Sequence, residues 1–464
     1  MSDTLVNPTV TTSQPDPQRL AWGVLLISFA IFCLICVISG IGVNYFLFQS
    51  AVPMESRLLV GRGTVGIIQS DSPESEQAER RERILSDTNN VTMQTDAQSQ
   101  ATLAFRDDAL DQLVASVTLK NNTSLSLRTA SRPRFDWNST AYYVELTHVS
   151  GELDVILVDN LLHNIQMSAR APSGAIINLV DGGQYTIDIS DARIRVMSQR
   201  GNAVLIPPDY QSPRLISAGA QGVLYADRQE IAVEPAYVDL LVNSDFSQIT
   251  DQVNTGETQQ LLEGWVCAND PNDNPRGSYR SQIKDGRMTL RLVRGDNAET
   301  HGRTSCIQTF GQTGLAVSPD LYDYLALRAS FYIEHQSLNA CGIDGSECPL
   351  MLRMDYRQGD NVYQWFHGFY AVPLTPEQGY PLRCSSCSQD HEAVNGKAWY
   401  TYDSGNLFTL FPAEQRPDSI VGVWFYASGH QYDVFVSEVS LLAGQQMVTQ
   451  TGQNAENTAE SQSG

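Results

Sequence analysis

Short stretches of alternating apolar and polar residues dominate the chain from roughly residue 55 to residue 230. Representative apolar sets are Ala101, Leu103 and Phe105; Leu153, Val155 and Leu157; and Tyr185, Ile187 and Ile189. Gly, Asn, Asp or Pro ends each stretch after a few residues, and no long helical pattern interrupts the series. Because a period of two is typical of strands with one buried face, we predict an all-β unit over residues 55–230.

A continuous apolar run, residues 20–50, precedes these strands, and no charged residue occurs between Arg19 and Glu55. A helix needs about 20 apolar residues to cross a bilayer, and Trp22 and Tyr45 are placed like interfacial aromatics. The run is too long and too uniform for a half-exposed core helix. A cleaved signal peptide would have a shorter apolar region and a small-x-small site, which the residues around Ser50 lack. We therefore predict an uncleaved transmembrane helix over residues 20–50.

Both ends of the chain lack apolar periodicity. Residues 1–19 are polar and rich in Pro, Thr and Ser, and residues 445–464 are polar as well. We predict that both segments are disordered tails, since neither can bury enough apolar surface to fold. The N-terminal tail is also too short to hold a signalling or catalytic domain.

The formal net charge of −22 narrows the range of partners. An acidic surface repels phosphate backbones, so nucleic acid is not an expected partner. The membrane is an expected one, through the apolar helix. At 464 residues, the chain has room for two or three folded units after that helix.

Six of the eight cysteines lie in the C-terminal half of the chain, and the other two lie in the apolar run. An even number within one unit suggests disulfides and an oxidising compartment. The short-range pairing is Cys341–Cys348 and Cys384–Cys387, which leaves Cys267–Cys306, although six cysteines allow about 15 connectivities. The alternative is a zinc site made by Cys341, Cys348, Cys384 and Cys387.

Two signals disagree about which side of the membrane each end occupies. Arg19 precedes the apolar run, whereas Arg57 and Arg62 follow it, and this count mildly favours a cytoplasmic C-terminal part. The cysteines favour the opposite orientation. Giving the cysteines more weight, we predict a cell-membrane protein with a single span, a cytoplasmic N-terminal tail and extracytoplasmic C-terminal domains.

The order of motifs over residues 55–230 resembles the FecR-type extracytoplasmic domain. Thr95 precedes the alternating segment 101–105, Gly151-Glu152-Leu153-Asp154-Val155 matches the middle strand, and residues 198–205 match a later one. The chain departs from the family at Ala109-Leu110 and Ala171-Pro172, where Gly-Ser and Thr-Pro are usual. The resemblance implies a module that relays an outer signal through one helix to a cytoplasmic sigma-factor regulator. The short N-terminal tail cannot be that regulator.

The segment 238–444 resembles galactose-binding-like and carbohydrate-binding jelly rolls. It opens with Asn243-Ser244-Asp245-Phe246, followed by Gly264-Trp265, and closes with a strand that contains Val436-Ser437-Glu438-Val439. Ser244 replaces the family's usual Gly, and Glu438 replaces its usual Asp. The resemblance implies a β-sandwich whose first and last strands pair, and a surface that can bind sugars.

No catalytic motif stands out. The seven histidines form no HExxH pair, and the chain has no GxSxG elbow, P-loop or GxGxxG. Paired carboxylates could cut glycosides, but nothing in so acidic a chain singles out one pair. We therefore expect no enzymatic activity.

Two groups of residues are candidates for binding. Flat aromatic rings can stack on sugars, and the predicted ligand-binding residues are Trp365, His367, Trp399, Tyr400 and Tyr402. Their alternative role is to fill the sandwich core, because period-two spacing places Trp365 and His367 on one face. A structural calcium ion is the one candidate cofactor, with oxygen ligands from Asn269, Asp270, Asn272 and Asp273. Such residues also favour ordinary turns.

The sequence thus favours a membrane-anchored recognition or sensing protein that binds a glycan or another envelope ligand without catalysis. The alternative is a structural or assembly protein of the cell envelope that acts through protein–protein contacts. A glycoside-active enzyme is a third hypothesis.

Overall fold

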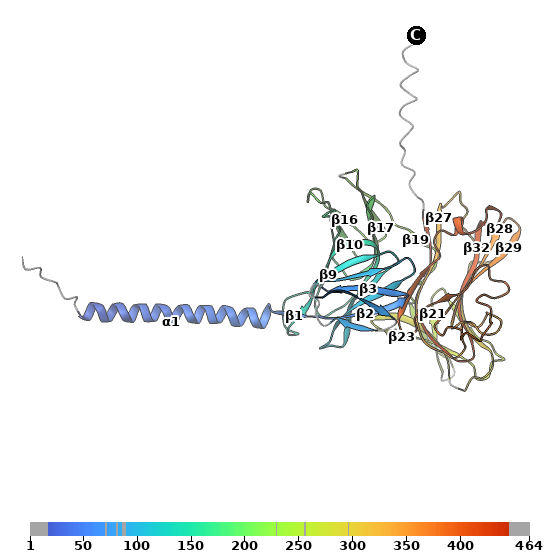
Figure 1. The fold of residues 1–464 in the computed structure, drawn as a ribbon, viewed down its shortest axis with the longest axis horizontal. Coiled ribbons are helices and arrows are strands. Elements are labelled where there is room, and N and C mark those ends of the chain that lie inside the picture. Colours follow the sequence, from blue (N-terminus) through green and yellow to red (C-terminus); the bar gives the residue numbers. More distant parts are fainter. Residues whose placement is uncertain are drawn as a thin grey trace, which may run out of the picture. The chain divides into compact units, whose positions relative to one another are not determined.

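The computed structural model describes residues 17–69, 72–79, 82–85, 90–228, 230–254, 257–295 and 297–444. One long helix is followed almost entirely by strands, so the predicted all-β class with a single N-terminal apolar helix is confirmed (Figure 1). The helix begins at Pro17, and residues 17–19 therefore do not belong to a disordered tail. The rest of the two predicted tails lies outside the described residues.

The chain forms two compact units. Of the described residues, the first unit comprises 17–52 and 132–141, and the second comprises those within 53–131 and 142–444. Both β modules belong to the second unit. The two predicted β domains are therefore two parts of one compact unit.

Helix α1 spans Pro17–Phe48. Its first residue is a proline, which suits the first helical position because its fixed φ is helical and no hydrogen bond is lost there. The helix is apolar on every side, and the side chains of Trp22 and Ile41 are 66% and 65% exposed. The segment Ala21–Phe48 is long and apolar enough to cross a membrane, although a signal sequence near an N-terminus has the same features.

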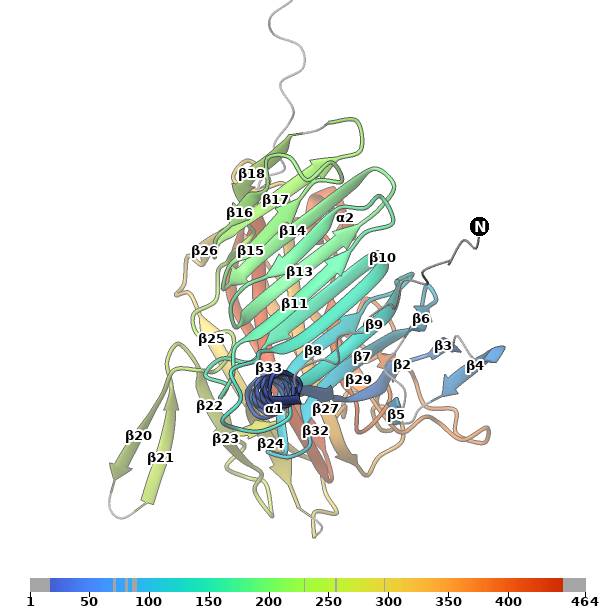
Figure 2. The same cartoon turned by 90° about the vertical axis from the view of Figure 1, so that its left-hand side faces the viewer.

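The first module contains one hydrophobic cluster that extends from Met54 to Ile231. Its strands form two sheets that close into a barrel, and Figure 2 shows β10, β13, β14 and β17 side by side. Alternation explains the core, because every second residue of most strands points inward. The strands from α1 onward are β1 (Ala51–Pro53), β2 (Glu55–Arg62), β3 (Thr64–Gln69), β4 (Ser72–Glu79), β5 (Arg83–Leu85), β6 (Val91–Thr95), β7 (Gln100–Asp107), β8 (Gln112–Leu119), β9 (Ser124–Pro133), β10 (Tyr142–Leu157), β11 (Ile165–Arg170), β12 (Ile176–Leu179), β13 (Gly183–Ile189), β14 (Arg193–Arg200), β15 (Ala203–Ile206), β16 (Arg214–Ile216), β17 (Ala220–Tyr225) and β18 (Ile231–Pro235).

Strand β10 belongs to both sheets of this barrel. Its first half pairs with β9 and β11, and its second half pairs with β8 and β13. The register shifts between Thr147 and Ser150, and the next residue, Gly151, has a φ of +95°. A Cβ atom at Gly151 would lie 2.6 Å from Oγ1 of Thr123, so the bend requires glycine there.

The second module is a sandwich of two sheets around a separate hydrophobic cluster, Leu241 to Ala443. We call the sheet with the order β23-β24-β33-β27-β31 the β33 sheet, and the sheet with the order β22-β25-β32-β28-β29-β30 the β32 sheet. Val238 pairs with Ala443, so the first and last strands lie together, as the jelly-roll resemblance implies. The elements are β19 (Val238–Asp239), β20 (Ile249–Asn254), β21 (Glu257–Leu262), β22 (Val266–Asn269), β23 (Ser278–Lys284), β24 (Arg287–Arg294), β25 (Gly302–Thr309), β26 (Leu315–Ala316), β27 (Tyr324–Gln336), β28 (Leu350–Gln358), β29 (Asn361–Tyr370), β30 (Glu392–Ala393), β31 (Trp399–Asp403), α2 (Leu407–Leu410), a 3₁₀ turn (Ala413–Gln415), β32 (Ser419–Gly429) and β33 (Tyr432–Gly444).

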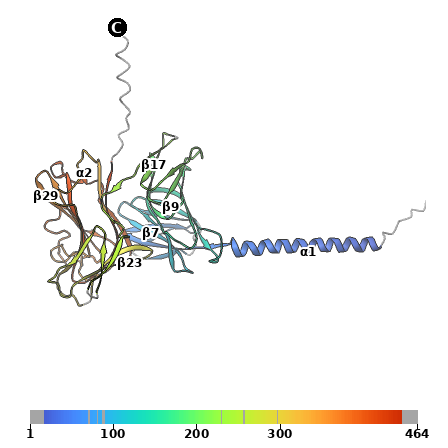
Figure 3. The same cartoon turned by 180° about the vertical axis from the view of Figure 1, so that it is seen from behind.

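Polar contacts join the β33 sheet to the first module. An Nη atom of Arg328 lies 2.9 Å from a carboxylate oxygen of Asp154, and Nζ of Lys120 lies 3.1 Å from the same oxygen. The side-chain amide of Gln100 donates to the Thr401 carbonyl at 2.9 Å and accepts from the Thr401 amide at 2.7 Å. All five residues are buried. The β33 sheet is thus covered on both faces, whereas Figure 3 shows the sheet of β29 on the far side from the first module.

The charges in this contact depend on one another. Burial by itself would raise the pKa of Asp154, but the positive charges of Arg328 and Lys120 lower it to about 2. Burying an ion costs several kcal/mol, roughly, unless an opposite charge compensates. Removing one charge of this network would therefore leave its partner buried without full compensation, which lowers the stability of the contact.

Candidate functional site

The five side chains predicted to bind a ligand are buried. Exposed fractions are 2% for Trp365, 5% for His367, 3% for Trp399, 6% for Tyr400 and 7% for Tyr402. Trp365 and His367 point inward from β29 and meet Tyr402 of β31, with ring centroids of His367 and Tyr402 4.8 Å apart. Four of the five are thus brought together between the sheets, where they fill the core. This placement favours the alternative role that their spacing left open.

Trp399 points in the opposite direction from its neighbour Tyr400, as alternation requires. Its indole nitrogen donates to Asp285 at 3.0 Å, and the guanidinium carbon of Arg287 lies 4.5 Å from its ring centroid. Arg287 in turn donates to Ser116 of the first module at 3.0 Å. Trp399 is therefore part of the contact between the modules and offers no ring face to a sugar.

His367 is a neutral side chain inside the core. Burial, together with the nearby charges of His391 and Arg62, lowers its pKa to about 3. Its Nε2 atom lies 3.4 Å from a carboxylate oxygen of Glu392, whose other oxygen accepts hydrogen bonds from Arg62 and Tyr400. These contacts join His367 to polar groups at the edge of the core, where Arg62, Glu392 and Tyr400 line a small pocket.

A second set of aromatic residues lies on the face of the β32 sheet that points away from the β33 sheet. Val423 and Phe425 of β32 are buried, so Trp424 and Tyr426 point outward, and both are partly exposed. Phe366 of β29 is partly exposed on the same face, opposite in direction to Trp365. These three partly exposed aromatic residues lie outside the predicted set.

Arg353 of β28 connects these rings. It lies directly opposite Phe366 on one neighbouring strand and Trp424 on the other. Its guanidinium carbon is 4.4 Å from the Trp424 centroid and 5.5 Å from the Phe366 centroid, distances at which a cation attracts an aromatic face. Two of its nitrogens each donate to a different carboxylate oxygen of Asp355 at 2.7 Å. We call Phe366, Arg353, Asp355, Trp424 and Tyr426 the outer aromatic face.

Gly422 makes room for the indole of Trp424. A Cβ atom built at Gly422 would lie 2.9 Å from a ring carbon of Trp424. The indole therefore extends over the glycine two residues before it, along the surface of the sheet. Rings held in this way on strands, beside a paired guanidinium and carboxylate, can contact the apolar face of a sugar and hydrogen-bond its hydroxyls without first becoming ordered.

The three disulfides in the structure are the predicted pairs, Cys267–Cys306, Cys341–Cys348 and Cys384–Cys387. The last two pairs belong to a small hydrophobic cluster with Met351 and Tyr370, and Phe366 and Tyr426 pack against this cluster. The disulfide-linked loops therefore border one end of the outer aromatic face and support two of its rings.

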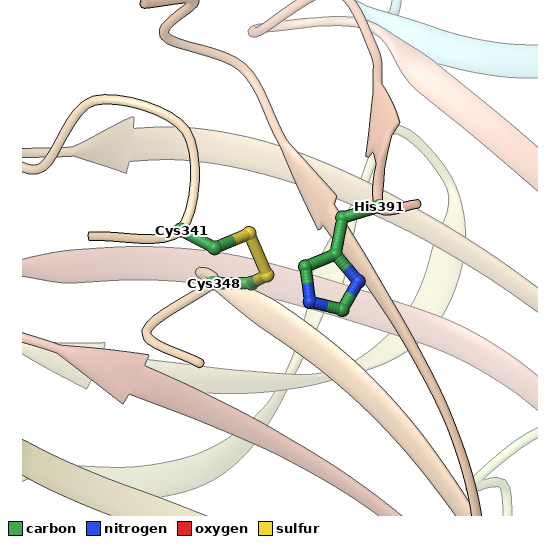
Figure 4. Close-up of side chains that lie close together, drawn as sticks. All are labelled: Cys341, Cys348 and His391. Atoms are coloured by element: carbon green, nitrogen blue, oxygen red, sulfur yellow. A yellow bond between two sulfur atoms is a disulfide. The ribbon is translucent and has the colours of Figure 1, made fainter. Parts of the chain in front are cut away.

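His391 lies beside both of these disulfides, and Figure 4 shows it next to Cys341–Cys348. Its Nδ1 atom accepts a hydrogen bond from the Gly368 amide at 2.9 Å, and its Nε2 atom donates to the Gly345 carbonyl at 2.8 Å. Burial lowers the pKa of His391, which keeps the ring neutral. Because both ring nitrogens have backbone partners and the sulfurs are paired, the arrangement favours disulfides over the alternative zinc site.

The predicted calcium ligands Asn269, Asp270, Asn272 and Asp273 lie at the end of β22 and in the turn that follows it. The side-chain oxygen of Asn269 accepts from the Thr304 hydroxyl at 2.7 Å, and Asp273 accepts from the Arg303 amide at 2.7 Å. A carboxylate oxygen of Asp270 accepts from the Asn272 amide at 3.0 Å. These contacts are typical of a turn stabilised by its own side chains, and calcium stays an untested prediction.

The comparisons with known proteins give weak likenesses only. No protein-family model and no curated protein sequence matches the chain. A solved structure of an anti-sigma factor from Parabacteroides distasonis is similar over 31% of this chain and 59% of its own, at 14% identity and a TM-score of 0.24. A family 11 carbohydrate-binding module from Clostridium thermocellum, in complex with a β-1,3-1,4-mixed-linked tetrasaccharide, covers 46% of this chain and 96% of its own, at 8% identity and a TM-score of 0.25.

Two further solved structures extend the range of these likenesses. The carbohydrate-binding module TmCBM61, in complex with β-1,4-galactotriose, covers 44% of this chain at 10% identity and a TM-score of 0.23. An exo-β-agarase covers 46% of this chain but is matched over 25% of its own length, at 10% identity and a TM-score of 0.22. All these scores are too low to carry an argument, so the chain is assigned to no family, and its function has to be argued from its own residues.

Proposed function

We propose that the protein is a membrane-anchored recognition protein that binds a glycan on the outer aromatic face of its second module. The observation that carries the proposal is the row Phe366–Arg353–Trp424, in which a guanidinium lies between two partly exposed rings and is fixed by Asp355. Sugar rings offer apolar faces and hydroxyl groups within a few ångströms of each other. The row offers both kinds of partner side by side.

The proposed location is the outer side of the cell membrane, with α1 as an uncleaved anchor. Three disulfides support an oxidising compartment for the second module. The first module, with its FecR-like order of motifs, is proposed to transmit or position rather than to bind. No catalytic role is proposed.

A glycan array probed with the purified full-length protein in detergent tests the proposal. We expect Trp424→Ala to weaken binding of the best glycan about 30-fold, which corresponds to the roughly 2 kcal/mol typical of a central aromatic contact. Arg353→Lys keeps the charge but loses the planar two-nitrogen contact with Asp355, so an intermediate loss is expected. Tyr210→Ala is the matched control, because Tyr210 is an exposed aromatic on the first module, at 60% exposure.

The results test glycan binding and the position of the binding site separately. Glycan binding that persists in a folded Trp424→Ala protein would place the site elsewhere. If the wild-type protein binds no glycan, the envelope-assembly alternative becomes the leading one, and cross-linking in intact cells would then identify the protein partner.

A further inference from the structure

The segment 132–141, which we call loop 132–141, begins with the last two residues of β9 and leads to β10, and it belongs to the same compact unit as helix α1. Its sequence, RPRFDWNSTA, combines two aromatic residues with two arginines. The last carbonyl groups of a helix have no partner within the helix and must find one elsewhere. The loop provides hydrogen-bond donors for carbonyl groups at the C-terminal end of helix α1.

The hydrogen bonds between the loop and the helix end involve several residues. The amide and hydroxyl of Ser139 both donate to the Phe48 carbonyl, at 3.0 and 2.9 Å. The Arg134 amide donates to the Ser50 carbonyl at 3.1 Å, and the side-chain amide of Asn138 donates to the same oxygen. The loop is thus held at the end of the apolar helix by its backbone and by two polar side chains.

The aromatic side chains of the loop continue the apolar surface of the helix. Phe135 meets Phe46 edge-on, with centroids 5.7 Å apart, and Trp137 stacks on Phe135 at 4.9 Å with an interplanar angle of 5°. The guanidinium carbon of Arg134 lies 5.0 Å from the Phe46 centroid. Trp137 is nevertheless 62% exposed, as open as the residues of the helix itself.

We propose that loop 132–141 is a second membrane contact, in which Trp137 and Phe135 enter the interfacial zone of a phospholipid bilayer and Arg134 lies at the level of the lipid phosphates. Trp has an apolar body and a polar N–H, which suits this zone, and Arg can extend its charged end toward phosphate while its stem stays in apolar surroundings. The occupant follows from continuity, since the stacked rings extend the surface of a helix that is apolar on every side. The proposal assumes that α1 spans the membrane.

Depth-dependent fluorescence quenching tests this contact with the full-length protein in vesicles of brominated phosphatidylcholine. The chain has six tryptophans, of which Trp22 lies on α1, so Trp22→Phe provides the background. In that background we expect bromines near the headgroup end of the acyl chains to quench fluorescence more than bromines near the tail end. Adding Trp137→Phe should abolish this quenching. Because the vesicles contain no other protein, quenching can only come from lipid.

The matched control moves the indole to another site. In the protein that lacks both Trp22 and Trp137, Tyr210→Trp places an indole at a position where the native tyrosine is 60% exposed, close to the 62% of Trp137, and we expect it not to restore quenching. Quenching that is absent in the Trp22→Phe background, or that survives Trp137→Phe, would overturn the proposal. Stronger quenching by the tail-end bromines would also overturn it. Retention in the vesicle pellet after a carbonate wash reports on the anchor separately.

Discussion

Both sheets of the second module carry a tryptophan whose ring lies against an arginine. In the β33 sheet, Arg287 lies 4.5 Å from the centroid of Trp399, and in the β32 sheet, Arg353 lies 4.4 Å from that of Trp424. The local geometry is nearly the same, yet Trp399 is 3% exposed and Trp424 is partly exposed. The first module covers the former pair. The same side-chain pair therefore serves packing in one sheet and is available for a ligand in the other.

The two arginines also differ in their exposure to solvent. Arg287 is buried, and the loss of hydration lowers its pKa to about 10. Arg353 keeps contact with solvent and forms a paired contact with Asp355. A charge that is already compensated by a neighbour can add hydrogen bonds to a ligand without a large desolvation cost, whereas a buried one has no ligand to reach.

The largest expected difference in the free energy of unfolding is between the variants that truncate Trp399 and Trp424. Trp399→Ala would leave a cavity between the modules, and we expect the free energy of unfolding to fall by roughly 3–5 kcal/mol. Trp424→Ala would remove a partly exposed ring and should cost about 1 kcal/mol. Urea unfolding of both proteins, followed by circular dichroism, measures the two losses. Equal losses would mean that the outer ring is as tightly packed as the inner one, and would count against an open site.

The ion pairs Arg328–Asp154 and Arg353–Asp355 should differ less than the two tryptophans in what they contribute to the free energy of unfolding. Arg328→Met leaves Asp154 buried with one of its two cationic partners, and the expected loss is about 3 kcal/mol. Arg353→Met removes the partner of Asp355, which is itself only 8% exposed, and should cost about 1–2 kcal/mol, between the values for an exposed and a buried pair. The measurement is again the urea midpoint with its slope. A loss at Arg328 no greater than the one at Arg353 would show that the contact between the modules contributes little to stability.

The core between the two sheets should make the stability of the protein depend on pH. His367 has a folded pKa of about 3, against 6.5 for an ordinary histidine, so the unfolded chain binds a proton there that the folded chain does not. Its stabilising contribution is complete above pH 6.5 and decreases as the pH falls toward 3, with a slope of at most about 1.4 kcal/mol per pH unit.

Asp239 changes the pH dependence of stability in the opposite direction, because burial raises its pKa to about 6. The folded protein holds an extra proton there between pH 3.8 and about 6, so acidification through that range is stabilising at this site. The His367 effect is therefore measured as the difference between wild type and His367→Phe in urea midpoint from pH 7 to pH 4. Parallel curves for the two proteins would contradict a depressed pKa at His367.

Local sequence patterns predict much of this fold. A long segment without charged residues predicts the apolar helix, and period-two alternation predicts the strands. Both patterns are local, because they depend only on which side chains of one segment face apolar or polar surroundings. The cysteines at 341 and 348, and those at 384 and 387, are close enough in the chain that proximity favours their pairing. Alternation even separates Trp365 from Phe366 and predicts that they face opposite ways.

The signal that could have identified the outer aromatic face is the same alternation applied to β32. Trp424 and Tyr426 alternate with Val423 and Phe425, and this places the two larger rings together on the other face. Alternation divides residues between two faces, but it does not say which face is covered. Because of that ambiguity, alternation alone does not identify the inward-facing Trp365 and His367 as buried residues.

The contacts that each face of a sheet makes depend on the tertiary structure. Asp154 and Arg328 belong to different modules, and Ser139 reaches the end of a helix that stops 91 residues earlier in the chain. No pattern along the chain reports such pairings, because a strand has the same alternation whether its outer face contacts a second module, a ligand or water. Local sequence is therefore sufficient to predict the helix, the strands and the two faces of each strand. Tertiary contacts covered one of two similar tryptophan–arginine pairs and left the other accessible.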